Sequence, residues 1–223
     1  MKSTLYGIGV GPGDKELLTV KAVRAIENSD VVVAPSAMEG GESIALETAR
    51  EYIKEGTEVV IKHFPMGKKN RIEKAKEAYD FIEEKLKEGK VVSFLTIGDP
   101  FVYSTYIHLL THMKEKKFKV ETIAGITSFC AAASIVERTL VIGENRLVIL
   151  PATKVNEITD EKYVVIMKVY KHEKEVIETL EEKGFTDYVY VSRAGRDGQL
   201  ILTDKEEIIN SRDYMSLILA SKE

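Results

Sequence analysis

The chain has 223 residues, a formal net charge of -4 at pH 7, a charged fraction of 30% and a single cysteine, Cys130. This length suffices for one large or two modest domains with their own cores, and the acidic balance argues against nucleic acid as the main partner. One cysteine cannot form an internal disulfide, no apolar run reaches the ~18 residues of a membrane span, and the amino terminus has no signal-peptide core, so we expect a cytoplasmic protein that does not bind membranes.

Strand-like apolar runs alternate with helical patterns through the first half of the chain. Strands are expected at 5–10, 30–36, 57–64 and 91–98, and helices at 17–29, 43–56, 71–89 and from about Phe101 onward. Such alternation predicts a mainly parallel sheet covered by helices on both faces. A strand and a small-residue helix at 127–137 follow the charged run that starts near 114, and we place a domain boundary there, so that the first α/β domain spans 1–117.

The second half of the chain, 118–223, has a different pattern. Five strand candidates lie at 146–153, 162–170, 187–195, 198–203 and 213–221, and one clear helix lies at 171–184. Short strands with few helices between them predict a mixed sheet rather than a second parallel one. The expected fold class is therefore α/β, with two different lobes and a cleft between them, which is a common place for a ligand.

The first turn follows the strand at 5–10 and reads LYGIGVGPGD over 5–14. A dinucleotide fingerprint needs a third glycine where this turn has Pro12, which offers no backbone N–H to a pyrophosphate. No Gly-Lys-Ser/Thr follows, so the turn is not a P-loop. Two interpretations remain: a tight strand-to-helix turn without a ligand, in which Asp14 caps the next helix, or a turn that holds something other than phosphate.

The second turn, Gly98-Asp99-Pro100, follows the apolar strand at 91–98. In a parallel sheet this places it at the carboxyl edge, where ligands of open α/β sheets bind. Glycine lets a ligand approach the backbone, and Asp99 supplies an acceptor. The alternative is a plain helix start, with Asp99 as the cap and Pro100 in the first helical position.

The third turn reads IAGITSF over 123–129 and places two hydroxyl residues at a helix start. Thr127 and Ser128 either cap this helix or hydrogen-bond a ligand, and the turn taken alone favours capping. Cys130 lies in the same small-residue helix. Its surroundings favour a role in core packing over that of a catalytic nucleophile.

These three turns, in this order, resemble those of the tetrapyrrole methylase family, the S-adenosylmethionine-dependent methyltransferases that build corrins and siroheme. The resemblance extends to VVIMK at 164–168 and SRAG at 192–195, and so covers nearly the whole chain. Within the family, GDPFVYSTY and VILPAT are most similar to the C-20 methylases that act on precorrin-2 or cobalt-precorrin-2. One departure is visible, because the family usually has Pro-Gly where this chain has Ala124-Gly125.

The resemblance implies a cofactor and a site. S-adenosylmethionine would lie in the cleft between two α/β lobes of a class III methyltransferase fold, with the first domain on the side of the substrate trough and S-adenosylhomocysteine as the product. A tetrapyrrole substrate, with or without cobalt, and a homodimer are also implied. The cofactor-binding residues would be Pro12, Ile97, Gly98, Asp99, Val102, Thr127, Ser128, Met167 and Ala194. The substrate-binding residues would be Gly11, Gly13, Asp14, Ser104 and Thr105.

Methyl transfer from a sulfonium to an electron-rich ring carbon is an in-line displacement, for which positioning supplies most of the acceleration. A base is needed at most to remove a proton afterwards. We take Tyr103, which lies beside the Gly-Asp-Pro turn, as the candidate catalytic residue. The segment from Gly9 to Gly13 would then form the floor of the cleft, where glycines let cofactor and macrocycle approach the backbone.

Other polar residues give weaker signals. His108 and His112 stand four residues apart on one expected helix, but HLLTH lacks the glutamate of HExxH and a third ligand, so we expect no metal site. A substrate with many carboxylates needs cations. Candidates are the basic cluster Lys62, His63, Lys68, Lys69 and Arg71, which is otherwise a solvated face, and in competition with it Arg193 and Arg196.

Two alternatives remain open. A methylase of the same family that acts on another corrin carbon, or on the diphthine precursor of a translation factor, would share the cofactor site, although diphthine synthases lack the GPGD form of the first turn. The second alternative comes from a different class: a non-catalytic ligand- or nucleotide-binding module that uses a Rossmann-like turn also fits the glycine pattern.

Overall fold

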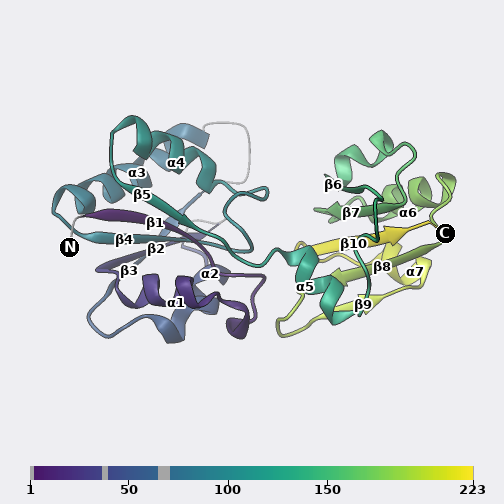
Figure 1. Cartoon of the computed structure of the whole chain (residues 1–223), viewed down its shortest axis with the longest axis horizontal. Coiled ribbons are helices and arrows are strands. Elements are labelled where there is room, and N and C mark those ends of the chain that lie inside the picture. Colours follow the sequence, from purple (N-terminus) through teal and green to yellow (C-terminus); the bar gives the residue numbers. More distant parts are fainter. Residues whose placement is uncertain (1–2, 37–39, 65–70, 223) are drawn as a thin grey trace. The chain divides into compact units, whose positions relative to one another are not determined.

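The computed structural model describes residues 3–36, 40–64 and 71–222, and the chain divides into two compact units, Met1–Thr127 and Ser128–Glu223 (Figure 1). The division falls later than the boundary predicted between 117 and 118. The reason is β5 (Val120–Ile123), which pairs in parallel with β1 (Thr4–Gly9) and so belongs to the sheet of the first unit.

The first unit contains a five-stranded sheet in the order β3-β2-β4-β1-β5. All of its strand pairs are parallel, which confirms the prediction. The remaining strands are β2 (Val31–Ser36), β3 (Glu58–His63) and β4 (Val91–Thr96). Because every strand runs the same way, all carboxyl ends lie along one edge of the sheet.

Helices cover both faces of this sheet, as Figure 1 shows. They are α1 (Val20–Glu27) and α2 (Ile44–Ala49) on one face, with the short 3-10 turns η1 (Lys15–Leu17) and η2 (Arg50–Tyr52), and α3 (Arg71–Lys87) and α4 (Tyr106–Glu115) on the other. Successive strand side chains point to opposite faces, so Phe94 packs in the core beneath α3 and α4 while Leu95 packs beneath α1 and α2. Each face therefore has its own apolar core.

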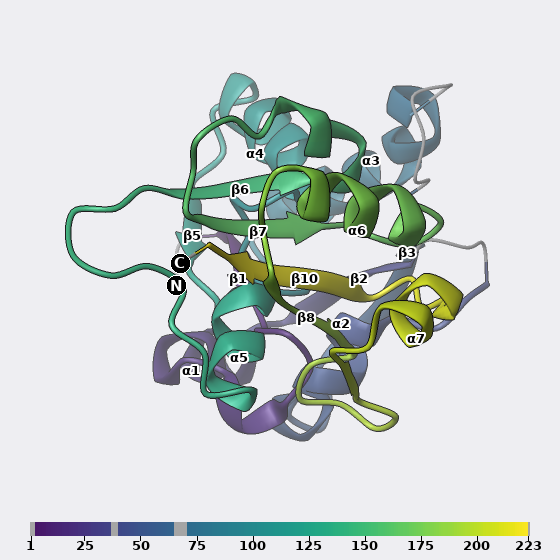
Figure 2. The same cartoon turned by 90° about the vertical axis from the view of Figure 1, so that its right-hand side faces the viewer.

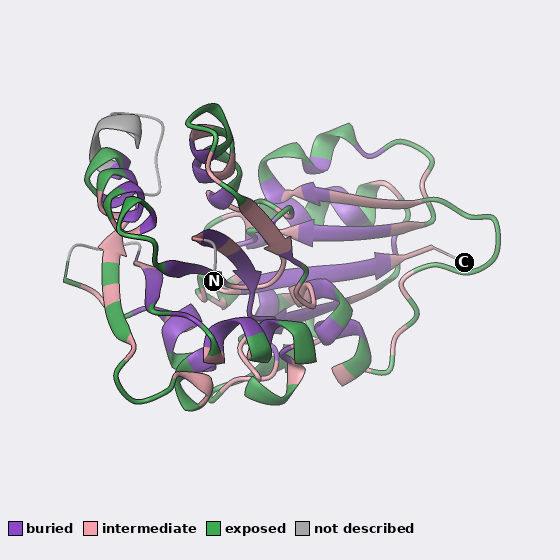
Figure 3. Cartoon of the chain, turned by 60° about the vertical axis from the view of Figure 1, so that its left-hand side comes forward, coloured by how far each residue is buried: buried purple, intermediate pink, exposed green. Residues whose placement is uncertain are grey.

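Burial differs sharply between the centre and the margin of this sheet. Every residue of β4 is buried, whereas β3 is mostly half-buried or exposed (Figure 3). A central parallel strand is covered on both faces and reads as a continuous apolar run, as VVSFLT does. The turn that leaves β4 therefore starts from the most firmly held strand of the unit.

The start of α4 differs from the prediction. A helix was expected from about Phe101, but α4 begins at Tyr106. Gly98 and Tyr103 have φ values of 70° and 50°, in the left-handed region that a right-handed helix cannot contain. The residues between β4 and α4 therefore form an irregular loop at the carboxyl edge of the sheet.

The second unit contains a mixed sheet in the order β6-β7-β10-β8-β9, which also confirms the prediction. Its strands are β6 (Leu147–Pro151), β7 (Tyr163–Met167), β8 (Asp187–Ser192), β9 (Leu200–Leu202) and β10 (Ser216–Ser221). β6 and β7 are parallel, and the other neighbours are antiparallel. All five strands coincide with predicted segments.

Helices α6 (Glu173–Glu182) and α7 (Lys205–Asn210) and the 3-10 helix η3 (Ala152–Glu157) share one apolar core with the second sheet, and α5 (Ser128–Ile135) contacts β10 (Figure 2). Helix α7 was not predicted; it is a single short helix whose first turn is capped by Asp204 through the N–H of Glu207 at 3.0 Å. Within the described ranges, no helix has both the length and the apolar character needed to cross a membrane.

Candidate functional site

Three loops meet at the carboxyl edge of the first sheet, where they leave the neighbouring strands β4, β1 and β5. We call the segments 10–14, 97–105 and 124–127 the three glycine loops. The first two are joined by an isolated antiparallel bridge between Gly11 and Gly98. The N–H of Gly98 donates to the carbonyl of Gly11 at 2.6 Å, and the reverse bond measures 3.3 Å. The structure thus brings together two residues that the sequence placed on separate turns.

The Asp99 carboxylate ties the third glycine loop to the second. Its Oδ2 accepts a hydrogen bond from the N–H of Gly125 at 3.0 Å, and its Oδ1 accepts one from the N–H of Phe101 at 2.8 Å. The alternative in which Asp99 caps the next helix is therefore wrong, because α4 begins only at Tyr106. A carboxylate has about four lone-pair sites, so Asp99 keeps acceptor capacity for a ligand donor.

The glycine loops can lie this close together because Gly9 and Gly125 have no side chain. A Cβ on Gly125 would lie 2.1 Å from the carbonyl oxygen of Gly98, and a Cβ on Gly9 would lie 2.5 Å from the nitrogen of Gly125. Gly9 is therefore packed against the protein's own backbone and does not offer a ligand the access expected from the sequence. Gly98 differs, because a Cβ there would meet nothing within 4 Å. Of these glycines, Gly98 is the one a ligand can approach.

The first glycine loop also has a structural function. Asp14 caps η1, since its carboxylate accepts from the N–H of Glu16 at 2.9 Å. Pro12 and Gly11 are buried, and Gly13 has a φ of 137°. Asp14 is thus partly committed to the local turn, as one of the two interpretations of this sequence predicted.

The loop between β4 and α4 carries Tyr103, Ser104 and Thr105. The Ser104 hydroxyl accepts a hydrogen bond at 3.1 Å from the N–H of Tyr106, the first residue of α4. Tyr103 is 45% exposed and has the left-handed φ of 50°, which is strained for an aromatic residue. Burial of part of its side chain raises the pKa of the Tyr103 phenol. The phenol therefore stays protonated at neutral pH, and it can donate a hydrogen bond more readily than it can accept a proton.

Two hydroxyl groups, those of Thr96 and Thr127, are shielded from solvent beside these loops. Among the described residues, neither Thr96 Oγ1 nor Thr127 Oγ1 makes a hydrogen bond. The expectation that Thr127 caps α5 through its hydroxyl is therefore wrong. Thr96, which was not among the predicted site residues, ends β4 and directly precedes Ile97 and Gly98. Buried polar groups are normally paired, so two unpaired hydroxyls indicate a place where a ligand supplies the partner.

The candidate residues of the second unit also share one edge of a sheet. Met167 ends β7 and pairs with Leu217, which in turn pairs with Val191 near the end of β8. Ala194 lies two residues beyond the end of β8 and is buried. The adjacent Arg193 has a φ of 48°, and its Nε donates to Asp213 at 2.6 Å. Met167 and Ala194 are therefore presented at the same end of the second sheet.

A sequence model of the tetrapyrrole (corrin/porphyrin) methylases matches residues 4–209 of this chain. The chain belongs to the tetrapyrrole methylase family. The match contains all three glycine loops and the strands of the second unit up to β9. The resemblance stated from the sequence is confirmed.

Curated relatives of this methylase match it from end to end. A protein of Methanocaldococcus jannaschii named "probable cobalt-precorrin-2 C(20)-methyltransferase" is 34% identical over 225 residues, which cover 98% of this chain and 96% of the relative. The cobalt-precorrin-2 C(20)-methyltransferase of Salmonella typhimurium is 30% identical over 233 residues, which cover 100% and 98%. The subgroup suggested by GDPFVYSTY is thus the one to which these relatives are assigned.

Solved structures share the fold of the methylase. The cobalt precorrin-4 methyltransferase CbiF superimposes with a TM-score of 0.79 at 22% identity, covering 98% of this chain and 94% of the other. The uroporphyrin-III C-methyltransferase of Thermus thermophilus, solved in complex with S-adenosylhomocysteine, gives a TM-score of 0.73 at 19% identity and covers 97% of each chain. The predicted fold class is therefore confirmed.

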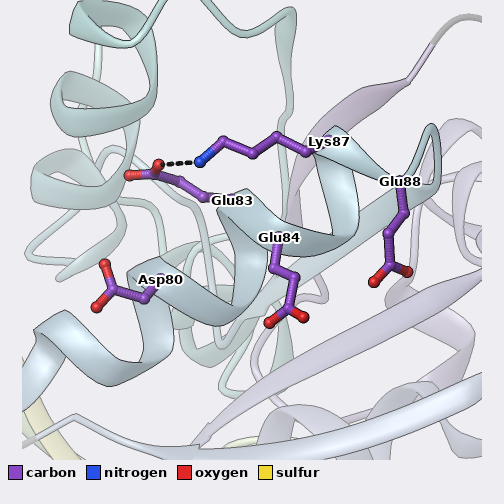
Figure 4. Close-up of a pocket in the computed structure, with 5 residues that line it drawn as sticks. All are labelled: Asp80, Glu83, Glu84, Lys87 and Glu88. Atoms are coloured by element: carbon purple, nitrogen blue, oxygen red, sulfur yellow. Dashed lines mark hydrogen bonds and ion pairs between the residues drawn. The ribbon is translucent and has the colours of Figure 1, made fainter.

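A shallow hollow lies on α3 in the first unit. It is lined by Asp80, Glu83, Glu84, Lys87 and Glu88, and we call it the α3 hollow. Figure 4 shows Glu83 turned toward Lys87, while Glu84 and Glu88 point away from this pair. The hollow lies at the end of α3 that leads into the first residue of β4, and therefore at the opposite edge of the sheet from the glycine loops.

One of the two histidines of α4, His112, contacts a glutamate of the α3 hollow. His112 Nε2 lies 2.7 Å from Glu83 Oε1, whereas His108 is exposed. Burial raises the pKa of Glu83, but hydrogen bonds from His112 and Lys87 outweigh this effect, and the pKa lies below its ordinary value. His112 therefore ties α4 to α3. Within 3–36, 40–64 and 71–222, no group of three His, Cys, Asp or Glu side chains is arranged to hold a metal ion.

The remaining sequence candidates have varied surroundings. Lys62 donates to Glu77 at 2.9 Å, so its charge is already compensated within the unit. Lys68, Lys69 and the side chain of Arg71 lie outside the described residues. Cys130 is exposed, so the expectation that it packs in a core is wrong. The small residues of this helix indicate that one of its faces packs closely, but they do not identify the residues that lie on that face.

Proposed function

We propose that this methylase transfers a methyl group from S-adenosylmethionine to C-20 of precorrin-2 or cobalt-precorrin-2, a step of cobalamin biosynthesis. The observation that carries the proposal is the end-to-end similarity, at 30% and 34% identity, to two proteins named for this activity. The GDPFVYSTY stretch of the second glycine loop supports the same subgroup.

The proposed cofactor site includes the backbone at Ile97 and Gly98, whose open side admits a ligand, together with the remaining acceptor capacity of Asp99. The other proposed contacts are Pro12, Val102, Thr127, Ser128, Met167 and Ala194. The shielded Thr127 hydroxyl, which has no partner among the described residues, fits this assignment because a bound polar group would pair with it. When bound, S-adenosylmethionine supplies the methyl group as part of a sulfonium.

The proposed task of the chain's own residues is positioning. Gly11, Gly13, Asp14, Ser104 and Thr105 would face the substrate. The bridge between the first two glycine loops and the bonds of Asp99 fix these segments relative to each other. Rigid placement of this kind would hold the acceptor carbon in line with the methyl group and the sulfur. This alignment is the main requirement of methyl transfer to a nucleophilic carbon. Tyr103 would act as a neutral hydrogen-bond donor beside the reacting ring, with a pKa that burial raises.

The substrate test is incubation of the protein with methyl-labelled S-adenosylmethionine and either cobalt-precorrin-2 or its metal-free form, followed by mass spectrometry of the tetrapyrrole. We expect one labelled methyl group to be gained and nuclear magnetic resonance to place it on C-20. Methylation of another ring carbon would assign the protein to a different methylation reaction of the same family. No gain on either tetrapyrrole would refute it.

Binding alone distinguishes the non-catalytic alternative. Calorimetric titration with S-adenosylhomocysteine should give saturable binding, and titration with NAD should give none. Binding of NAD but not of S-adenosylhomocysteine would indicate that the first turn belongs to a dinucleotide-binding site.

We further propose, from the family resemblance, that the protein is a homodimer and works in the cytoplasm. Sedimentation equilibrium tests the first of these statements directly. A monomeric mass over the full concentration range would contradict it.

A further inference from the structure

Three large side chains with apolar surface are exposed directly after the Gly98-Asp99 turn. Phe101 is 57% exposed, Tyr103 45% and Ile107 41%. Elsewhere in the part of the chain that the structure describes, exposed large apolar side chains occur singly or in pairs. We call these three residues the aromatic platform. Single exposed apolar residues need no explanation, but three in one short segment that begins in the second glycine loop do.

The backbone beneath Phe101 is held firmly. Asp99 accepts from the N–H of Phe101 at 2.8 Å through Oδ1, and its carbonyl accepts from the N–H of Val102 at 3.2 Å. The same carboxylate binds the N–H of Gly125 at 3.0 Å. The position of Phe101 is therefore coupled to the contact between the second and third glycine loops.

The ring of Phe101 rests on a second aromatic ring that is fixed from below. Phe101 meets Tyr106 edge-on, with ring centroids 6.3 Å apart. Tyr106 is fully buried, and its hydroxyl lies 2.7 Å from Thr122 Oγ1 on β5. A Cβ on Gly7 would lie 2.0 Å from the Tyr106 ring, so the glycine in β1 makes the space that the tyrosine fills. Tyr106 thus packs against β1 at Gly7 and supports the exposed ring of Phe101.

We propose that the aromatic platform binds one face of the substrate macrocycle, with Phe101 as its principal contact, an inference that rests on the function proposed above. A tetrapyrrole is a broad ring system with carboxylates at its rim, and its face offers apolar surface that a rigid aromatic side chain can cover. Phe101 is three residues from Gly98, which limits the separation of the two to ~10 Å of extended chain. A ring whose reacting carbon lies near Gly98 therefore reaches the platform without leaving this edge of the sheet.

The variants that test the platform are Phe101→Ala, Phe101→Tyr and, as a matched control, Val20→Ala. Val20 is 66% exposed on α1 of the same unit and lies in none of the glycine loops. The binding probe is cobalt-precorrin-2 in the presence of saturating S-adenosylhomocysteine, which prevents turnover, followed through the visible absorption of the macrocycle. Calorimetry with S-adenosylhomocysteine alone reports separately on the cofactor.

We expect Phe101→Ala to raise the dissociation constant of cobalt-precorrin-2 about tenfold, because one stacked aromatic contact and its buried area are lost. Phe101→Tyr retains the ring and should stay within about threefold of the wild type. Val20→Ala should bind as the wild type does. S-adenosylhomocysteine should bind equally to all four proteins, and with substrate the loss should appear in KM more than in kcat.

Several results would overturn the platform. One is an unchanged macrocycle affinity in Phe101→Ala. Another is a lower sedimentation mass of Phe101→Ala with macrocycle affinity intact, which would make the platform a contact with a second copy of the chain. Equal losses of macrocycle and S-adenosylhomocysteine binding would point to a distorted loop. If the wild type binds S-adenosylhomocysteine but no tetrapyrrole, the proposed function itself fails, and this outcome is distinct from a failure of the platform.

Discussion

The glycine loops and the α3 hollow lie at opposite edges of the first sheet and differ in how their polar groups are satisfied. In the α3 hollow, the Glu83 carboxylate has partners on several sides, with the His112 ring at 2.7 Å and the ammonium groups of Lys87 at 3.2 Å and Lys116 at 3.9 Å. At the glycine loops, Thr96 and Thr127 have shielded hydroxyls with no partner among the described residues.

This difference separates a structural cluster from a binding site. Titratable groups in a depression suggest chemistry at first sight, but a carboxylate that already has its counter-charges is expected to stabilise the fold. Polar groups without partners and a glycine with an open side leave interactions for a ligand to complete. Four substitutions can break or sharpen this contrast, and they are ordered by the expected size of their effect.

The largest effect is expected for Gly125→Ala. The added methyl group would lie 2.1 Å from the carbonyl oxygen of Gly98, and neither backbone segment can move without breaking the loop contacts. We expect a loss of unfolding free energy of at least about 3 kcal/mol, measured by urea denaturation followed by circular dichroism. The control is Gly56→Ala, where φ is unfavourable at 87° but a Cβ meets nothing within 4 Å. That variant should lose about 1 kcal/mol, and equal losses in both would contradict the packing argument.

The second effect concerns Asp99. Asp99→Ala removes the acceptor of two backbone N–H groups, those of Gly125 and Phe101. We expect the unfolding free energy to fall by about 2 to 3 kcal/mol and binding of S-adenosylhomocysteine to weaken with it. Asp99→Asn keeps one acceptor and should lie between the alanine variant and the wild type. If both variants retained wild-type stability, the carboxylate would not be what joins the loops.

How far the sequence predicts this arrangement can be judged from individual residues. The alternation of strands and helices predicted both sheets, because period and order are local properties of the chain. The function of Asp99 was not predictable in the same way. Its partner Gly125 lies 26 residues further along, so the local pattern offered only a ligand acceptor or a helix cap as interpretations. The late start of α4 has a related cause, since the left-handed φ of Tyr103 depends on the loop that surrounds it.

The glycines of the first turn show the same limit. The glycine-rich pattern includes Gly7 and Gly9, but the need for glycine at each position comes from a residue distant in sequence. A side chain at Gly7 would collide with Tyr106, and one at Gly9 would collide with Gly125. Thr96 gave no signal at all, because a threonine at the end of a strand is unremarkable until its hydroxyl is found without a partner. The sequence therefore identified where the loops are but not which of their atoms remain available.

The third effect should be confined to stability. Glu83→Gln keeps the shape of the side chain but removes the charge that His112 and Lys87 face, and we expect a loss of about 1 to 2 kcal/mol at neutral pH. Because the folded protein holds the pKa of Glu83 below its ordinary value of 4.5, the wild-type advantage is present above that value and is lost as the pH falls through the lowered pKa. Urea denaturation of both proteins at several pH values measures this convergence. Binding of S-adenosylhomocysteine should not change, and a loss of affinity would make the α3 hollow part of the site.

The smallest change in stability is expected for Thr127→Val, and it is the most direct test of the contrast. Valine has nearly the shape of threonine but no hydroxyl, so the variant deletes a shielded polar atom that has no partner among the described residues. The unfolding free energy should stay the same or rise slightly, because a shielded hydroxyl without a hydrogen bond destabilises the fold. S-adenosylhomocysteine should bind about fivefold more weakly if the hydroxyl is completed by the cofactor. Thr139→Val, at an exposed position, is the control for both measurements. Unchanged affinity would assign Thr127 to packing alone, whereas lost stability would mean that its hydroxyl has a partner within the protein.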